Sequence, residues 1–190
     1  MRDSFMLKIR DIELSDLPKI KKFKCSDSKM DYFLIKEAYY YHVIGEGITK
    51  LVVDVENNEI VGYFTLKCDS MKVFDIEMST EPEYIPCIEL SRIAIANHWQ
   101  NGVRGYHLGT HLMGHILNLI QTQISTVIGC KFITLHAAMD RVKWYNKRFS
   151  FIEVEDEKTI GKDDTVYMCL DITDKSKADE FSKFVSFHKK

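Results

Sequence analysis

The chain has 190 residues, 45% of them hydrophobic, and a formal net charge of −2. This length can bury one sizeable core, so we expect one domain over residues 1–172 and a charged helical tail over 173–190 that docks on it or awaits a partner. The near-neutral charge excludes a global basic surface of the kind that dominates non-specific nucleic-acid binding. Five scattered cysteines without a Cys-x-x-Cys pair argue against a disulfide framework or a zinc module, and they favour the cytoplasm. No apolar run approaches the length of a membrane span, so we expect no membrane anchor.

The first part of the chain predicts a strand and two helices. Residues 6–12 alternate as in a strand, and residues 15–18 resemble the capped start of a helix. Apolar residues recur at helical spacing over residues 28–44. Gly45 is expected to end that second helix.

A hairpin follows, and then an acidic stretch. Two strands over residues 48–55 and 60–67 flank residues 56–59, whose polar, asparagine-rich sequence is typical of a hairpin turn. Residues 69–86 carry many acidic residues without a clear period. We therefore expect an irregular surface segment there.

Strands and helices alternate in the second part of the chain. The pattern predicts strands over 87–96, 131–138 and 165–172, and helices over 110–128, ended by Gly129, and over 140–148. This order of elements predicts an α/β (α+β) fold with a mixed sheet and covering helices.

The residues from Ile88 to Met113 carry the strongest chemical signal, because a strand pattern leads through a glycine-bearing loop to the start of a helix. Gly102, Gly105 and Gly109 allow backbone angles and close approaches that other residues resist. The N-terminus of a helix presents unpaired N–H groups and the positive end of its dipole. The pattern therefore favours a phosphate-bearing ligand, although an ordinary strand-to-helix turn has the same appearance.

This stretch resembles the acetyl-CoA-binding core of the GNAT superfamily of N-acetyltransferases, whose signature Q/R-x-x-G-x-G/A follows a strand and opens a helix. The segments ELSRIAI and QNGVRGYHLGTHLM are similar to sequences of the histone acetyltransferase branch. Residues 143–151, KWYNKRFSF, look like the family's F-Y-x-x-x-G-F. Residues 23–38 resemble the "F-x-C, L-D-x-F-L, A" pattern of bacterial members that include toxins. The resemblance implies a mixed, mostly antiparallel central sheet flanked by helices.

The resemblance also implies that acetyl-CoA is the acetyl donor. The strand backbone would hold pantetheine, and the loop and helix start would hold the pyrophosphate. The implied binding residues are Ile93, Ala94, Ile95, Gln100, Arg104, Gly105, Tyr106, Leu108, Gly109 and Thr110. The sequence departs from the signature, since the loop is lengthened if Gln100 opens it, and His107 replaces a glycine if Arg104 opens it. Ser150 also stands where the family usually has glycine.

Acetyl transfer to an amine needs a group that removes the amine proton and one that protonates the departing thiolate. Glu89 aligns with the general base of the histone acetyltransferase branch; the alternative is an ion-paired Glu89, with Arg92 as a candidate partner. Tyr145 resembles the family tyrosine that donates a proton to sulfur. Its alternative role is that of an aromatic core residue at a helix end.

Other residue patterns give only weak indications of a metal site or a nucleophile. His107, His111 and His115 recur every four residues, but no second cluster completes a metal site, so we expect surface histidines and no metal. Cys87 is interpreted as an inert core residue rather than a nucleophile.

The identity of the acceptor stays open. The main hypothesis is direct attack by a primary amine of a small molecule, protein or peptide. A toxin-type enzyme that acetylates aminoacyl-tRNA is an alternative, motivated by basic residues over 19–24 and 141–148, although the net charge does not support tRNA binding. An inactive CoA-binding or interaction module is a third hypothesis, and a homodimer is left open. The acidic residues of 69–83 would equally suit a cationic amine.

Overall fold

The computed structural model describes residues 6–73, 83–102, 105–154 and 164–188. The chain divides into two compact units. The first unit comprises residues 1–69 and 88–123, and the second comprises residues 70–87 and 124–190. The single domain expected over residues 1–172 stays a prediction.

The sheet of the first unit contains four strands in the order of the chain. They are β1 (Leu7–Asp11), β2 (Ile48–Asp54), β3 (Glu59–Val73) and β4 (Glu83–Ile95), of which β3 and β4 extend into the second unit. β1 pairs antiparallel with β2, and β2 pairs antiparallel with β3. The three strands predicted before residue 69 are thereby confirmed, the third with a later end.

The turn between β2 and β3 forms as its polar sequence predicts. The Asp54 carboxylate accepts hydrogen bonds from the backbone N–H groups of Glu56 and Asn57, at 3.1 and 3.3 Å. Asn58 has a φ of 52°, a left-handed conformation that asparagine tolerates better than most residues. Local chemistry therefore holds the turn, and the pairing of β2 with β3 shifts its register further on, between Val52 and Val53.

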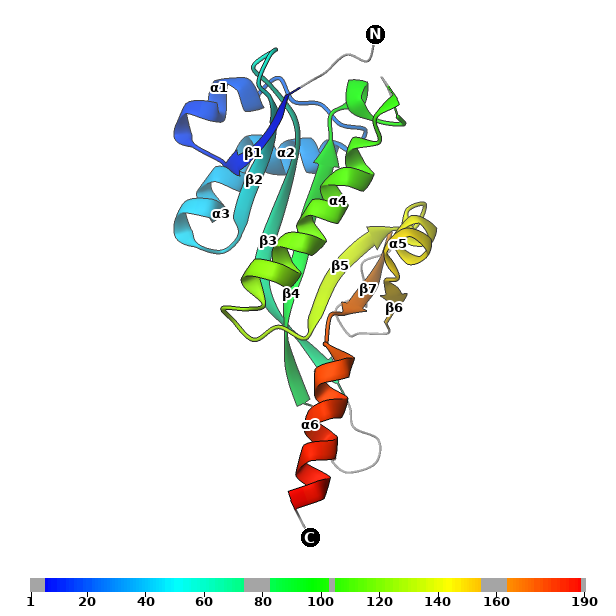
Figure 1. The fold of residues 1–190 in the computed structure, drawn as a ribbon. Helices are drawn as coiled ribbons and strands as arrows, with labels where there is room; N and C mark the ends of the chain where they lie inside the picture. The colour runs from blue at the N-terminus through cyan, green and yellow to red at the C-terminus, as the bar shows by residue number, and fades with distance from the viewer. Residues whose placement is uncertain (1–5, 74–82, 103–104, 155–163, 189–190) are drawn as a thin grey trace. The chain divides into compact units, whose positions relative to one another are not determined.

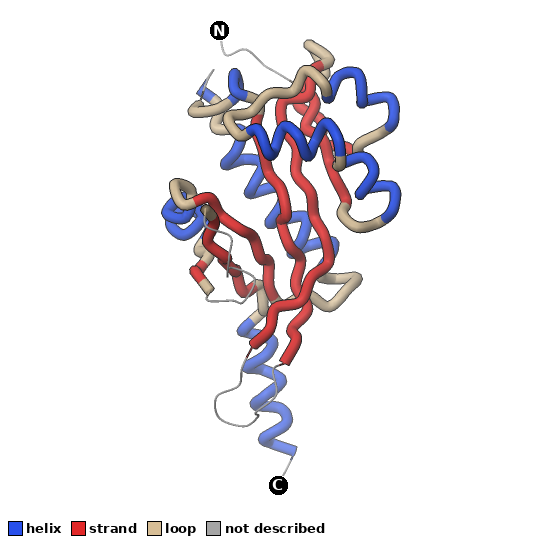
Figure 2. Tube along the Cα trace, turned by 180° about the vertical axis from the view of Figure 1, so that it is seen from behind, coloured by secondary structure: helices blue, strands red, loops and turns tan. Residues whose placement is uncertain are grey.

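Helices cover both faces of this sheet. They are α1 (Leu17–Ile20), α2 (Ser28–Lys36), α3 (Ala38–Ile44) and α4 (Leu108–Leu119), with 3-10 turns at Leu14–Asp16 and Asn97–Trp99. Figure 1 shows α4 along one face of the strands, and Figure 2 shows α2 across the opposite face. Buried side chains of the sheet and helices, such as Leu34, Leu51, Phe64, Met113 and Ile116, form the core between them.

The helix predicted over residues 28–44 is interrupted at Glu37, whose φ of −120° and ψ of −36° lie outside the helical region. Phe33 in α2 and Ala38 in α3 are both buried, so each segment keeps the apolar face that produced the periodic pattern. The pattern therefore fits one straight or one interrupted helix equally well. Gly45 ends α3 as predicted, with a φ of 78°.

The helix predicted over residues 110–128 differs at both ends. It begins at Leu108, ends at Leu119 and continues as a π-helical turn over Ile120–Ile124, so Gly129 does not end it. The Thr122 hydroxyl donates to the Asn118 carbonyl at 2.8 Å, a bond that commonly bends a helix.

The irregular segment predicted over residues 69–86 is wrong at both ends, because β3 continues to Val73 and β4 begins at Glu83. Met71 and Cys87 are buried with Tyr167 and Cys169 in one apolar cluster of the second unit. Because Met71 and Cys87 are buried, β3 and β4 extend beyond the residues that the hydrophobic pattern assigned to strands. Residues 74–82 lie outside the described part of the chain.

The second unit places three strands in the order β5-β7-β6. They are β5 (Phe132–Ala138), β6 (Ile152–Glu153) and β7 (Thr165–Asp171). Both pairings are antiparallel, with Phe132 opposite Asp171 and Ile152 opposite Cys169. The strands expected over 131–138 and 165–172 are confirmed, whereas β6 is too short to give a periodic signal.

Two helices complete the second unit, α5 (Val142–Phe149) and α6 (Lys175–His188). α5 confirms the helix predicted over residues 140–148. In α6 the described side chains of residues 175–180 and Ser182 are exposed, and docking of this tail stays a prediction. No helix in the described ranges is long and apolar enough to cross a membrane.

Candidate active site

The end of β4 is the strand that the resemblance assigns to pantetheine. Ala94 is buried, and Ile93 and Ile95 are half-buried. The neighbouring strand contributes Gly62, where a Cβ atom would lie 3.0 Å from the Ala94 carbonyl oxygen and 3.0 Å from Ile95 Cδ1. A side chain at position 62 would therefore displace the end of β4.

The glycine loop after β4 needs its glycines. Gly102 and Gly105 both have a φ of 71°, and the Gly105 N–H donates to the Gly102 carbonyl at 2.8 Å. The His107 ring lies against Gly102, because a Cβ atom there would be 2.7 Å from the imidazole Cε1. Arg104, a predicted phosphate contact, lies outside the described residues.

The N-terminus of α4 supplies the polar groups that an anion needs. The N-cap position belongs to His107, and Thr110 is the third helical residue, so Thr110 does not cap the helix. The N–H groups of Thr110 and His111 donate to the His107 carbonyl, whereas the Gly109 N–H has no acceptor among the described residues. Leu108 is buried and anchors this helix start. The free amide and the helix dipole favour a bound phosphate.

Aromatic stacking ties the loop to α4. The ring centroids of Tyr106 and His111 lie 4.4 Å apart, and the ring planes differ by 5°. His107, His111 and His115 are exposed, as expected of surface histidines. Within the described part of the chain, no three His, Cys, Asp or Glu side chains gather in a way that would hold a metal ion.

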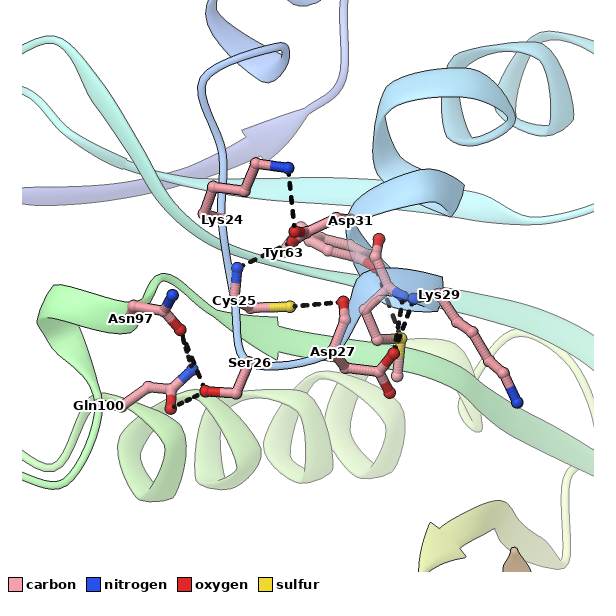
Figure 3. Close-up of polar contacts among 10 residues, drawn as sticks. Lys24, Cys25, Ser26, Asp27, Lys29, Asp31, Tyr63, Asn97 and Gln100 are labelled. Atoms are coloured by element: carbon pink, nitrogen blue, oxygen red, sulfur yellow. Dashed lines mark hydrogen bonds and ion pairs between the residues drawn. The ribbon is translucent and has the colours of Figure 1, made fainter.

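Gln100 links the end of β4 to the loop that carries Ser26. Its amide nitrogen Nε2 donates to the Ile95 carbonyl at 2.7 Å, and its Oε1 lies 3.0 Å from the Ser26 hydroxyl. Figure 3 shows Ser26 pointing toward both Gln100 and Asn97. Gln100 thus holds the end of the strand, a role that the signature alone does not indicate.

Glu89, the candidate general base, lies on β4 in the first unit with 7% of its surface exposed. Its carboxylate Oε2 is 3.1 Å from the ammonium nitrogen of Lys67. Arg92, the partner considered from the sequence, instead lies over the Phe33 ring at 4.9 Å and donates to the Ser91 carbonyl. The ion pair of Glu89 is therefore with Lys67.

Tyr145, the candidate general acid, lies on α5 in the second unit and is also 7% exposed. Its ring contacts Trp144 and Phe151 edge-on, at centroid distances of 4.8 and 5.9 Å. Burial raises the pKa of Tyr145 to about 12, and the nearby charge of Arg141 opposes this shift. The hydroxyl therefore keeps its proton at neutral pH, as a proton donor must.

Ser150 ends α5 in a left-handed conformation, with a φ of 61° and a ψ of 24°. Glycine adopts this conformation without the steric cost that a Cβ atom brings. The structure therefore explains why glycine suits this position. Asn146 supports the turn, since its Nδ2 donates to the Phe151 carbonyl at 2.9 Å.

Neither Cys25 nor Cys87 lies in the surroundings of a nucleophile. The Cys25 thiol lies 3.4 Å from the Asp27 carbonyl, and burial raises its pKa to about 11. Cys87 is 3% exposed and lies 3.8 Å from the Thr134 hydroxyl. The Cys25 thiol is therefore protonated at neutral pH, and Cys87 is buried in the core, as expected from the sequence.

Two residues of this region were missed in the sequence, Lys67 and Ser26. Lys67 gives no local signal, because its pairing with Glu89 depends on how two strands meet. Ser26 is 74 positions from Gln100. Only the early "F-x-C" resemblance draws attention to that loop.

Comparisons with known proteins support the fold. No protein-family model matches this sequence, and no curated protein matches it. A solved structure of a bacterial toxin matches with a TM-score of 0.72 at 19% identity, covering 89% of this chain and 92% of its own. AtaTR bound with acetyl-CoA matches with a TM-score of 0.70 at 17% identity, covering 87% and 94%. AtaT complexed with acetyl-methionyl-tRNAfMet matches with a TM-score of 0.68 at 16% identity, covering 93% and 98%. The expected α+β fold, with a mostly antiparallel sheet flanked by helices, is confirmed.

Proposed function

We propose that this chain is an N-acetyltransferase that moves the acetyl group of acetyl-CoA to a primary amine of a small molecule, protein or peptide. The observation that carries this proposal is the run of β4, glycine loop and α4 N-terminus within a fold that is shared with a protein solved with acetyl-CoA. The free Gly109 amide at the helix start suits a pyrophosphate.

The cofactor would be held mainly by backbone groups of the first unit. Ile93, Ala94 and Ile95 would present strand N–H and C=O groups to pantetheine, and Gly105 and Gly109 would face the pyrophosphate. When bound, acetyl-CoA supplies an activated thioester. Because no side-chain nucleophile is needed, the amine would attack the acetyl carbonyl directly.

Two side chains would handle the protons. Glu89, which is paired with Lys67, would accept the proton that the attacking amine releases. Tyr145, whose pKa is raised to about 12 by burial, would donate its proton to the departing thiolate. Glu89 and Tyr145 belong to different units of the chain.

A second candidate function is acetylation of the amino group of aminoacyl-tRNA. It is favoured by the neighbour complexed with acetyl-methionyl-tRNAfMet and by exposed cations on and beside α5. These cations are Arg141, Lys143, Lys147 and Arg148. Clustered cations on one helix can contact phosphates even when the whole chain is near neutral.

We place the reaction in the cytoplasm, because all five cysteines are free thiols. Cys68 is the exposed one, whereas Cys87 and Cys169 are buried and Cys25 and Cys130 are half-buried.

The test is an acetyl-transfer screen with the full chain and acetyl-CoA. Acceptors are small amines, peptides with free N-termini, lysine peptides and charged tRNA, with CoA thiol release and acetylated product as readouts. Product on an amine or peptide supports the main proposal, and product confined to charged tRNA supports the second candidate. Acetyl-CoA binding measured by calorimetry is the control, since absence of binding would overturn both.

A further inference from the structure

The loop over residues 24–27, which precedes α2, is fixed firmly to that helix (Figure 3). The Asp27 carboxylate caps α2 by accepting from the N–H groups of Lys29 and Met30, at 2.7 and 3.3 Å. The Asp31 carboxylate, which is largely buried, accepts from the Cys25 N–H at 2.8 Å. The loop therefore has a defined position before any ligand binds.

The opposite side of this loop is bonded to the segment that follows β4. The Lys24 carbonyl accepts from the Asn97 N–H at 2.9 Å. The Ser26 hydroxyl lies 3.1 Å from Asn97 Oδ1 and 3.0 Å from Gln100 Oε1. Through Gln100 the same network reaches the Ile95 carbonyl.

We propose that Ser26 is a positioning residue for acetyl-CoA, acting through Asn97 and Gln100 on the segment that joins the pantetheine strand to the glycine loop. This inference rests on the proposed function. The Ser26 hydroxyl carries one proton, which it can donate to either amide oxygen. Its loss removes one contact that fixes the Gln100 side chain, whose Nε2 still donates to the Ile95 carbonyl. A binding loop that is ordered in advance loses less conformational freedom when its ligand binds.

The placement of Ser26 separates this role from a role in stability. Ser26 is exposed, so removing its hydroxyl leaves no cavity and no buried polar group at position 26. Ser28, two positions later, is also exposed and makes none of these bonds. Ser28→Ala is therefore a matched control.

The experiment compares Ser26→Ala, Ser26→Thr and Ser28→Ala with the unmodified chain. Calorimetry measures the Kd of acetyl-CoA, and hydrogen exchange without cofactor measures the Asn97 and Gln100 amides, which donate to Lys24 and Asn97. We expect Ser26→Ala to weaken acetyl-CoA binding about fivefold, as the loss of one hydrogen bond implies. It should raise KM for acetyl-CoA and leave kcat at saturation within about twofold. Both amides should exchange faster, Ser26→Thr should restore binding, and Ser28→Ala should change nothing.

Two results would overturn the inference alone. One is unchanged acetyl-CoA affinity in Ser26→Ala while the unmodified chain binds normally. The other is an equal loss in Ser28→Ala, which would indicate a general effect on the loop. If the unmodified chain does not bind acetyl-CoA, the proposed function fails first and the inference falls with it.

Discussion

Glu89 and Tyr145 are buried to the same extent, with 7% of each residue exposed, yet their surroundings differ. Glu89 has an ammonium group 3.1 Å from its carboxylate. Tyr145 has aromatic rings around it, and burial raises its pKa to about 12. The carboxylate of Glu89 lies in an ion pair, whereas the hydroxyl of Tyr145 belongs to a ring packed among other aromatic rings.

Burial alone therefore does not determine which catalytic role a residue can fill. A base must be able to take up a proton, and an acid must still hold one when the leaving group departs. The neighbours of each side chain set these states. Substitutions at Glu89, at Tyr145 and at their neighbours should separate the two roles.

Tyr145→Phe should lower kcat about 10²- to 10³-fold, because it removes the proposed proton donor and keeps the ring. The contacts with Trp144 and Phe151 persist in this variant, so the melting temperature should change little. CoA thiol release at saturating substrates is the measurement. Tyr40→Phe, at an exposed tyrosine, is the control. Activity within threefold or so of the unmodified chain would remove Tyr145 from the mechanism.

Glu89→Gln should lower kcat/KM about 10- to 100-fold, because an amide of similar size cannot accept the amine proton. The pH profile of kcat/KM is the informative readout, since loss of a base removes its acidic limb. Glu59→Gln, which alters an exposed carboxylate paired with His98, serves as the control. A full rate in Glu89→Gln would leave Glu89 as a structural ion-pair partner.

Lys67→Met should lower the free energy of unfolding by about 1–2 kcal/mol, because a largely buried carboxylate loses its cation. The Lys67 side chain is 41% exposed, so water screens the ion pair and limits this loss of stability. Lys50→Met removes the cation of an Asp11 pair in which Asp11 is 56% exposed, and it should cost about 0.5 kcal/mol. Urea unfolding compares them, and equal losses would contradict the special position of Glu89.

Ser150→Gly should raise the free energy of unfolding by about 1 kcal/mol, since glycine relieves the left-handed conformation that ends the helix carrying Tyr145. Ser150→Ala keeps a Cβ atom and should bring no such gain. Thermal unfolding of the three proteins is the measurement. A destabilised Ser150→Gly would show that the serine side chain contributes more than the backbone costs.

Local chemistry made much of this fold predictable. Gly45 ends its helix as predicted, and residues 55–58 connect two strands near the predicted positions. The interruption at Glu37 was not predictable, because both segments share one apolar face. The extensions of β3 and β4 depend on Met71 and Cys87 packing against residues almost a hundred positions later.

In the candidate site, too, local features were predictable and contacts between distant residues were not. The start of α4 was placed two residues too late, since the helix begins at Leu108 rather than at Thr110. The partners of Glu89 and Gln100 were out of reach, because Lys67 and Ser26 approach them only once strands and loops are folded. A resemblance identifies which residues to consider, but the contacts that set their chemistry come from distant positions.

The free thiols differ in exposure, so one of them can be labelled selectively. Cys68 follows Lys67 on β3 and is exposed, while burial raises the pKa of Cys25 to about 11 and that of Cys169 above its usual value. A maleimide dye at neutral pH would therefore label position 68 first. A fluorophore placed there would report on this part of β3 without any engineered cysteine.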